Sequence, residues 1–485
     1  MNTRFVLWFL SVIVGLTFWP ASATCEPDAP KGKPNILFIM SDDHATHAIS
    51  AYGSKINITP NIDRLAASGM RFTNAFCENS LCSPSRAAML TGTMSCRNGV
   101  PDLSTPLPLD RTTFPALLGS AGYQTAMIGK WHLHRDPTGF DHWDMLPGQG
   151  DYRDPEFISA AGKRQVKGYV TDIITDKCID WLEHRDPDRP FLLFCHHKAP
   201  HRPWQPDAKH AAMYADADIP LPATFDDDYA TRSDAARRQT MSIENDLSSE
   251  DLKVEPPTGL TDAELKRWKY QRYMKDYLRC IASVDDNIGR LLDYLDTHGL
   301  ADNTIVIYTS DQGFFLGDHG WYDKRFMYEE SLRMPLLARV PGITKPGSMS
   351  AAFVQNIDFA PTLLHLAGAP IPKQMQGVSI RPLLSGQTPA DWRKSILYHY
   401  YEEPGPHNVA AHFGVRTDRY KLIRFYSAVK AWVLYDLKND PNELKNVYDD
   451  PEYTEVLTDL KAELSRLKTY YGDKTPEVVD AKTTK

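Results

Sequence analysis

The chain has 485 residues and a formal net charge of −8, with 42% hydrophobic and 24% charged residues. This length is ample for a large buried core, and no run of Lys or Arg indicates a nucleic-acid-binding surface. We therefore expect a globular protein that binds no nucleic acid. It must attract any anionic ligand through local cations, because its overall charge repels such a ligand.

The N-terminus is typical of a secretory signal peptide. Arg4 precedes an apolar run from Phe5 to Phe18, and residues 21–23 (ASA) offer a small-residue cleavage site. The apolar run is shorter than the roughly 20 residues that a membrane-spanning helix needs. We predict a signal peptide at residues 1–24, a protein exported to the periplasm or the medium, and no stable membrane span.

Four predicted buried strands each run into polar residues. The strands are expected at 36–40, 125–128, 191–195 and 304–309, and they alternate with helical patterns. In open α/β sheets the ligand crevice lies at the carboxyl ends of the strands. One site can therefore collect all the polar groups that follow them: Asp42 and Asp43; Lys130 and His132; His196, His197 and His201; Asp311 and Gln312.

A reactive cysteine stands at the start of a predicted helix. In the segment 82–86 (CSPSR), Ser83 is a good N-cap and Pro84 suits the first helical position. Cys82 would then lie just ahead of free backbone N–H groups and the positive end of the helix dipole, with Arg86 one turn behind. This arrangement suits an oxyanion bound against a nucleophile.

Two pairs of oxygen donors indicate a metal site. Asp42 and Asp43 are adjacent, so their repulsion would raise one pKa unless a cation intervened. Asp311 and Gln312 can complete the ligand set, and four oxygen donors favour Ca²⁺ or Mg²⁺ over zinc. The alternative is a pair of solvated aspartates at each strand end.

The rest of the chain divides into a catalytic part and a smaller C-terminal part. A long amphipathic helix is expected at 273–298. Residues 205–262 show little periodicity and are interpreted as an irregular surface excursion, either a solvated loop, which is the favoured alternative, or the border of a substrate cleft. Beyond about residue 372, antiparallel strands are predicted at 396–400, 413–416, 420–425 and 432–437, followed by a helix at 455–470 and a frayed tail from Gly472. The predicted fold is a large, mostly parallel α/β sheet flanked by helices in residues 25–372, with a C-terminal α+β subdomain in residues 373–485.

The cysteine count argues against a disulfide scaffold. Apart from Cys25 and Cys82, five cysteines remain, an odd number, so at most one or two bridges are expected. A zinc site made by Cys77, Cys82 and Cys96 lacks the paired short spacings of such sites.

The motifs resemble those of type I sulfatases. The resemblance covers the CSPSR segment together with residues 35–43 (NILFIMSDD), 59–65 (TPNIDRL), 129–132 (GKWH), 198–201 (KAPH) and 310–313 (SDQG), in the order that the family has them. It implies the alkaline phosphatase-like fold and the oxidation of Cys82 to formylglycine by a maturase. It also implies calcium, with Asp42, Asp43, Asp311, Gln312 and the residue derived from Cys82 as ligands.

The same resemblance implies roles for the catalytic residues. The hydrated aldehyde at position 82 attacks sulfur, and its second hydroxyl lets the aldehyde reform and sulfate leave. Arg86, together with the cation, lowers the pKa of the attacking hydroxyl. Lys130 binds sulfate or the diol oxygen, and His132 takes the diol proton. His201 acts as the general acid toward the leaving alcohol, and Lys324 binds the sulfate, although Arg325 is adjacent and could be confused with it.

Two further segments, 400–416 and 146–152, resemble bacterial carbohydrate sulfatases of the N-acetylglucosamine-6-sulfatase kind. Candidate sugar contacts are Asp151, Arg153, Trp204, His407 and His412, and an equally good interpretation places them between subdomains. We expect an exo-acting sulfatase on 6-O-sulfated glucosamine or a related glycan. The alternatives are a phosphate or phosphonate monoester hydrolase and a non-catalytic glycan-binding relative.

Overall fold

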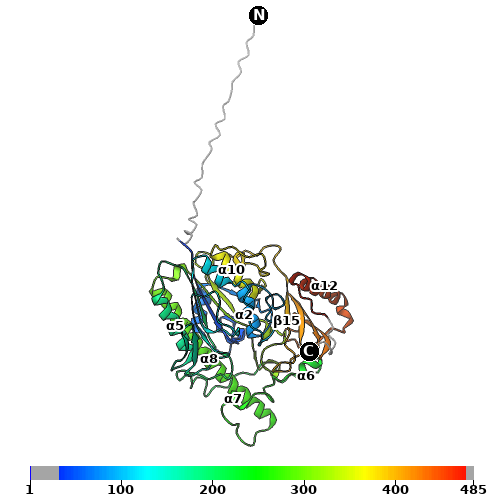
Figure 1. Cartoon of the computed structure of the whole chain (residues 1–485). Helices are drawn as coiled ribbons and strands as arrows, with labels where there is room; N and C mark the ends of the chain where they lie inside the picture. Colours follow the sequence, from blue (N-terminus) through cyan, green and yellow to red (C-terminus); the bar gives the residue numbers. More distant parts are fainter. Residues whose placement is uncertain (2–31, 477–485) are drawn as a thin grey trace.

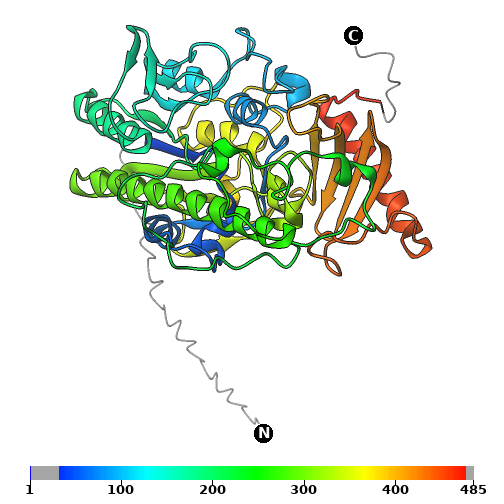
Figure 2. The same cartoon turned by 90° about the horizontal axis from the view of Figure 1, so that it is seen from below.

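The structure is a computed structural model that describes Met1 and residues 32–476. The predicted signal peptide, residues 1–24, lies outside these residues apart from Met1. A ten-stranded sheet forms the centre of the molecule (Figures 1 and 2). In spatial order its strands are β13 (Ser348–Ser350), β2 (Met70–Phe72), β12 (Leu336–Arg339), β9 (Thr304–Ser310), β1 (Asn35–Ser41), β8 (Phe191–His196), β4 (Gln124–Lys130), β5 (His142–Leu146), β6 (Glu156–Ser159) and β7 (Gly162–Gln165).

The middle of this sheet is parallel, as the sequence predicts. Strands β9, β1, β8, β4 and β5 all pair in parallel, whereas β12 pairs antiparallel with β9 and β2, and β6 pairs antiparallel with β5 and β7. Each of the four predicted strands is one to three residues longer than the apolar run that indicated it. Lys130 is consequently the last residue of β4 rather than a loop residue.

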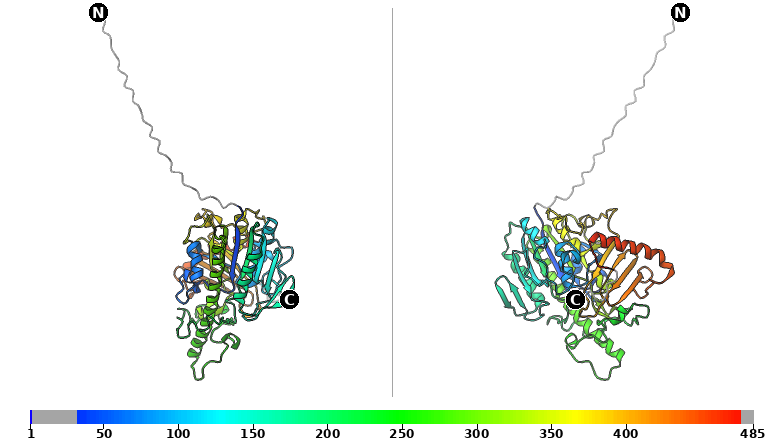
Figure 3. Two further views of the ribbon diagram at one scale, coloured as in Figure 1. Left: turned by 90° about the vertical axis from the view of Figure 1, so that its left-hand side faces the viewer. Right: turned by 45° about the vertical axis from the view of Figure 1, so that its right-hand side comes forward.

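Helices cover both faces of the large sheet because alternate strand residues point to opposite sides. Phe38 and Met40 of β1 belong to one core, and Leu37 and Ile39 belong to the other. Figure 1 shows helices on both sides of the sheet, and Figure 3 shows the molecule from two further directions. The first face carries α2 (Cys82–Thr91), α4 (Phe114–Ser120) and α10 (Phe359–Leu366), and the second carries α1 (Pro60–Ser68), α5 (Val170–His184) and α8 (Asp262–Thr297).

The C-terminal sheet is antiparallel, as expected, and packs between the main body and one helix. Its strands are β15 (Ser395–Tyr400), β16 (His412–Thr417), β17 (Tyr420–Tyr426) and β18 (Lys430–Asp436). Tyr398 and Ile423 lie in the core of the main body, whereas Leu422 packs with residues of α12 (Thr454–Tyr471) on the other face. Both faces of this sheet are therefore covered.

Short elements complete the described chain. The shorter helices are α3 (Ser95–Asn98), α6 (Asp234–Arg238), α7 (Ser249–Leu252), α9 (Glu329–Leu332) and α11 (Arg381–Leu384). The shorter strands form two pairs, β10 (Phe315–Leu316) with β11 (Tyr322–Asp323), and β14 (Val354–Gln355) with β3 (Ala75–Phe76). No helix within residues 32–476 is both long and apolar enough to cross a bilayer.

Three sequence-based expectations need correction. Helix α8 begins at Asp262, eleven residues before the expected start, where Thr261 and Glu264 form a reciprocal capping box. The segment 205–262 is not wholly irregular, since it contains α6 and α7. The predicted frayed tail from Gly472 is ordered at its start, because Asp473 is buried and bonds His399 at 2.6 Å, and the last part of that tail, residues 477–485, lies outside the described residues.

Candidate active site

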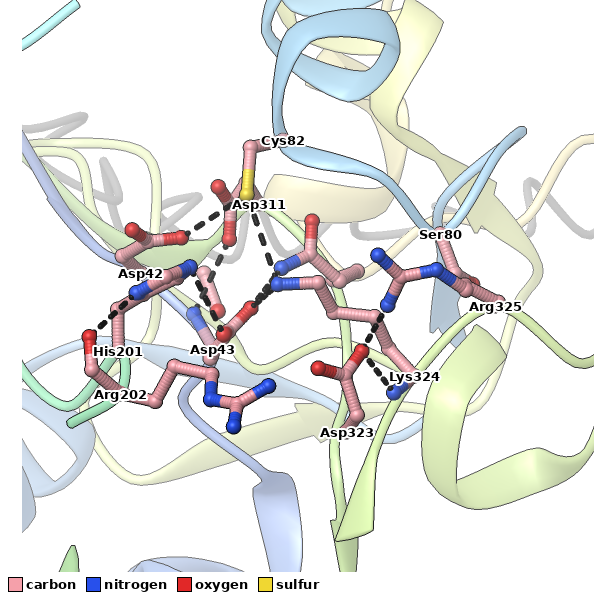
Figure 4. A network of polar contacts seen from close by, with 12 residues as sticks. Asp42, Asp43, Ser80, Cys82, His201, Arg202, Asp311, Asp323, Lys324 and Arg325 are labelled. Carbon is pink, nitrogen blue, oxygen red and sulfur yellow. Dashed lines mark hydrogen bonds and ion pairs between the residues drawn. The ribbon is translucent and has the colours of Figure 1, made fainter. Parts of the chain in front are cut away.

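The carboxyl ends of the central strands bring the predicted polar residues into one buried cluster (Figure 4). Asp42 and Asp43 follow β1, and Asp311 and Gln312 follow β9, the strand beside it. One oxygen of each aspartate lies within 4.8 Å of the others, and all four side chains are at most 1% exposed. The two pairs of oxygen donors predicted from the sequence therefore face one another.

Cys82 points into this cluster from α2. Its Sγ lies 3.3 Å from Oδ1 of Asp42, 3.6 Å from Nζ of Lys324 and 3.9 Å from Nζ of Lys130. Burial, reinforced by the charge of Asp42, raises the pKa of the Cys82 thiol. An unmodified cysteine here is a neutral thiol and a weak nucleophile.

The start of α2 differs from the sequence-based expectation. Leu81 is the N-cap, Cys82 is the first helical residue, and the Leu81 carbonyl accepts from the N–H of Ser85 at 3.0 Å. Ser83 does not cap the helix, because its hydroxyl donates to the carbonyl of His132 at 2.6 Å. The cysteine nevertheless stays at the N-terminal mouth of the helix, where the dipole favours an anion.

Arg86 joins two of the strand ends. Its Nε and Nη2 donate to Oδ2 of Asp311 at 3.1 and 3.0 Å, and its Nη1 donates to the carbonyl of Lys130 at 2.6 Å. The guanidinium is 2% exposed. It fixes the end of β4 against that of β9 and places a permanent positive charge under the cluster.

Two lysines neutralise part of the carboxylate charge. Lys130 pairs with Asp42, and Lys324 pairs with Asp43. Burial alone would raise the pKa of Asp42, but Lys130, His201 and Arg86 hold it well below its usual range. The pKa of Asp43 is raised to about 7 by burial and by the neighbouring carboxylates, although Lys324 opposes the shift.

The cluster has the composition of a site for a hard cation. Gln312 donates from Nε2 to Asp43, whereas its Oε1 is buried without a hydrogen-bond partner among the described residues. An orphaned carbonyl oxygen beside three carboxylates is costly unless a cation or water satisfies it. These four residues could therefore hold a metal ion through oxygen alone.

Gln149 is a site residue that sequence reasoning missed. Its Oε1 accepts from Lys130, and its Nε2 lies 3.3 Å from Nε2 of His132. It thus bridges the two polar residues that follow β4. A sequence signal for it exists, since Gln149 lies in the segment 146–152 that resembles carbohydrate sulfatases, but nothing in that segment favours Gln149 over Asp151 as a site residue.

His201 reaches the cluster from the loop after β8. Its Nδ1 bonds the carbonyl of Arg202 at 2.8 Å, so Nε2 faces Asp43, whose Oδ2 is 3.8 Å away. Burial and the nearby Lys130 lower its pKa well below the ordinary value. His196 does not join the cluster, because its ring stacks on Phe194 at 4.6 Å.

Of the two adjacent basic residues, Lys324 points into the cluster and Arg325 points away from it. Lys324 contacts Asp43 and Cys82, whereas Arg325 turns away to Asp323 and lies 3.9 Å from Glu402 (Figure 4). His407 joins this second group, with Nε2 3.2 Å from Oδ2 of Asp323.

Two of the five candidate sugar contacts lie in a cavity beside His201. Asp151 and Arg153 are exposed and line a cavity of about 530 Å³ together with Lys198, Arg202, Glu250 and others. Glu250 comes from α7, so the excursion at 205–262 does border a cleft, as one interpretation of the sequence had it.

Trp204 and His412 are placed where they cannot touch a ligand, contrary to their selection as sugar contacts. Trp204 is fully buried and packs on Tyr273, with ring centroids 4.5 Å apart. His412 is fully buried between the C-terminal sheet and the main body, where its Nε2 accepts from the backbone N–H of Met327 at 3.1 Å. The alternative interpretation, a contact between subdomains, is the correct one for His412.

The cysteines form neither bridges nor a zinc site in the described chain. All six cysteines within residues 32–476 are free thiols. Cys77 bonds Ser80 at 3.2 Å, and Cys96 reaches the carbonyl of Tyr471 at 3.6 Å, so neither turns toward Cys82.

Together the fold and the site are typical of one class of protein, the hydrolases of oxyanion esters: a cysteine at a helix N-terminus lies beside a buried cluster of oxygen donors that could hold a cation. The sequence matches the sulfatase family over residues 34–369, and the C-terminal part of N-sulphoglucosamine sulphohydrolase over residues 317–470. The chain belongs to the sulfatase family and is a sulfuric ester hydrolase.

Known relatives cover nearly the whole chain. It is 47% identical to an N-acetylglucosamine-6-O-sulfatase of Bacteroides thetaiotaomicron, over 92% of this chain and 88% of the relative. A solved structure of an enzyme in complex with its substrate D-glucosamine-2-N,6-O-disulfate is 46% identical, with a TM-score of 0.90 over 92% of this chain and all of the other. A phosphonate monoester hydrolase of Agrobacterium radiobacter, 22% identical, shares the fold with a TM-score of 0.74 over 90% of this chain and 96% of its own.

Proposed function

We propose that this sulfatase removes the 6-O-sulfate from a terminal glucosamine residue of a sulfated glycan. The observation that supports this most strongly is the near-complete match, at 46–47% identity, to enzymes that act on 6-O-sulfated glucosamines. The cavity beside His201 supports exo action, because its volume of about 530 Å³ suits a sugar unit rather than a crossing chain.

We further propose that Cys82 is converted to formylglycine and that the oxygen cluster holds Ca²⁺. Asp42, Asp43, Asp311 and Gln312 would be the ligands together with the modified residue 82, and the orphaned Gln312 oxygen supports this assignment. When bound, the ion supplies Lewis-acid stabilisation of negative charge on the transferring sulfuryl group. As its hydrate, formylglycine supplies an oxygen nucleophile where the buried thiol is a poor one.

The chain's own cations would hold the sulfate. Arg86, Lys130 and Lys324 surround the Cys82 side chain, and Lys130 and Lys324 each have Nζ within 4 Å of its Sγ. A sulfate ester bound there would meet preorganised positive charge as its oxygens become more negative. Lys324 rather than Arg325 is assigned to the sulfate, because Arg325 pairs with Asp323.

Two histidines would move the protons. His132 receives the proton from the hydroxyl at position 82, with its ring held by Ser83 at 3.4 Å from Nδ1 and by Gln149 at Nε2. Nε2 of His201 is the ring atom that faces the cluster. The negative charge of a bound sulfate ester would counteract the nearby lysines and favour the imidazolium form, which carries a proton at Nε2 that His201 donates to the departing sugar oxygen.

Export to the periplasm or the medium completes the proposal. The charged, apolar and small-residue segments at the N-terminus support it, and the partner that it requires is a formylglycine-generating maturase that acts before folding buries Cys82.

The test is desulfation of a panel of sulfated sugars by protein that was co-expressed with a maturase. We expect sulfate release from 6-O-sulfated glucosamines and at least about tenfold lower kcat/KM on 3-O-sulfated isomers. Faster cleavage of an aryl phosphate than of an aryl sulfate would instead favour the phosphoester hydrolase, and glycan binding by protein with an unmodified thiol, without turnover, would favour the binding protein.

A further inference from the structure

Lys198 carries a buried positive charge that the proposed chemistry does not use. Its side chain lines the cavity beside His201 although the residue is only 1% exposed. Nζ donates to the carbonyl of Arg202 at 3.3 Å and lies 4.9 Å from the ring centroid of Tyr152. Within residues 32–476, no carboxylate lies at ion-pair distance from it.

A buried ammonium group without a carboxylate partner destabilises the folded state. It has three donors, of which one has a protein acceptor, and burial of a charge without an opposite charge costs several kcal/mol. The pKa of Lys198 is correspondingly lowered to about 8, by burial and by the nearby Lys130. Buried groups whose pKa is shifted in this way are concentrated at binding and catalytic sites.

The other buried charges of the cavity wall are already neutralised. Arg202 donates from Nε to Oδ1 of Asp251 at 3.0 Å, and Oδ2 of Asp251 also accepts from the backbone N–H of Ser248 at 3.0 Å. Asp151, Arg153 and Glu250 are exposed at the rim, where water screens them. The interior of the cavity therefore presents the uncompensated charge of Lys198 to a ligand.

Lys198 lies on the side of the site where the leaving sugar would bind. Lys198 and His201 belong to one turn, in which the N–H of His201 donates to the carbonyl of Lys198 at 3.0 Å, and both line the same cavity. If His201 protonates the departing sugar oxygen, the sugar ring occupies this cavity. The Lys198 ammonium then faces the ring substituents and not the sulfate that is cleaved.

We propose that Lys198 binds a second anionic substituent of the sugar, the N-sulfate of a 6-O-sulfated glucosamine, and so makes the enzyme prefer the doubly sulfated sugar over its N-acetylated counterpart. This inference rests on the proposed function. It is supported by charge complementarity in the cavity and by the doubly sulfated ligand of the 46% identical structure. A charge-assisted contact of this kind is stronger than one to a neutral amide.

The test compares three 6-O-sulfated glucosamines that differ at nitrogen: N-sulfated, N-acetylated and free amine. For the wild-type enzyme we expect kcat/KM to fall in that order, because the free amine places a like charge near Lys198. In Lys198→Gln, the ratio of kcat/KM for the N-sulfated to the N-acetylated substrate should fall about 10- to 100-fold.

The matched control is Lys163→Gln. It removes the same charge from β7, where the side chain is 65% exposed and does not line the cavity, and it should leave the ratio unchanged. Thermal unfolding separates binding from folding, since removal of an unpaired buried charge should leave the melting temperature of Lys198→Gln equal to or above that of the wild type.

A binding measurement tests the role of Lys198 without depending on turnover, so its result is independent of the proposed function. Calorimetric titration with N-sulfoglucosamine and with N-acetylglucosamine should show about a tenfold loss of affinity in Lys198→Gln for the first sugar only. If the wild type removes no 6-O-sulfate, the proposed function is wrong, and the titration still decides the role of Lys198. Equal losses on every substrate, an unchanged ratio, or unchanged affinity for N-sulfoglucosamine would each overturn the inference.

Discussion

Calcium should stabilise the folded protein, with the side-chain oxygen of Gln312 as one of its ligands. A ligand at 100 times its Kd stabilises the folded state by about 2.7 kcal/mol. With about 2.1 cal/mol/K of unfolding entropy per residue, residues 32–476 contribute about 0.9 kcal/mol/K, so the expected rise in melting temperature is about 3 °C. The measurement is thermal unfolding of chelator-stripped protein with and without added Ca²⁺.

Gln312→Ala should abolish most of this rise. The variant removes one of four oxygen ligands, and even loss of a group that only supports a ligand weakens metal binding 10- to 100-fold. At a 100-fold higher Kd, the same Ca²⁺ concentration stabilises the protein by about 0.4 kcal/mol, which is below 1 °C.

Gln355→Ala is the matched control for this variant. Gln355 is also fully buried, also has an Oε1 without a partner among the described residues, and bonds the carbonyl of Leu397 at 2.7 Å, away from the cluster. It should lower the melting temperature but keep the calcium response. A full response in Gln312→Ala, or none in the wild type, would refute the assignment of these ligands.

Three further predictions concern residues around the site and the C-terminal region. Burial would raise the pKa of Asp473, but the hydrogen bond to His399 lowers it to about 2. The ionised carboxylate therefore stabilises the fold above about pH 4. This contribution is lost as the pH falls toward 2. Asp473→Asn should cost about 2 kcal/mol at pH 7, and unfolding curves that show no convergence with the wild type below pH 4 would contradict this reasoning. Trp204→Ala should destabilise by about 3–5 kcal/mol, whereas Trp204→Phe should leave KM for the sugar unchanged in steady-state kinetics; a large rise in KM would return Trp204 to the ligand site. Gln149→Leu should lower kcat about tenfold with little change in KM, because it releases His132, and a rise in KM alone would indicate a sugar contact instead.

The sequence predicts the centre of the site well because the site depends on local signals. Apolar runs end where polar residues begin, so the positions of Asp42, Asp43, Asp311 and Gln312 at adjacent strand ends follow from strand prediction and the crevice rule. The short motif around Cys82 was sufficient to place it at a helix mouth, although the helix begins two residues earlier than its capping residues indicated.

The cavity wall was not predictable, since it depends on tertiary packing. The motif at 198–201 places Lys198 near the site but does not indicate that its charge is buried without an acidic partner in the described chain. Nothing in the sequence distinguishes Trp204 in the core from a sugar-stacking Trp. The expected start of α8 was late because the first three turns are polar, and only the capping box at Thr261 and Glu264 indicates where the helix begins.

The most direct test of the account joins the chemical state of residue 82 to desulfation. Peptide mass spectrometry of the matured protein should find a formylglycine at position 82, with sulfate release from 6-O-sulfated N-acetylglucosamine proportional to the fraction converted. Cys82→Ala should bind the sugar without releasing sulfate. Equal turnover by protein that retains an unmodified Cys82 thiol, or by Cys82→Ala, would contradict the account.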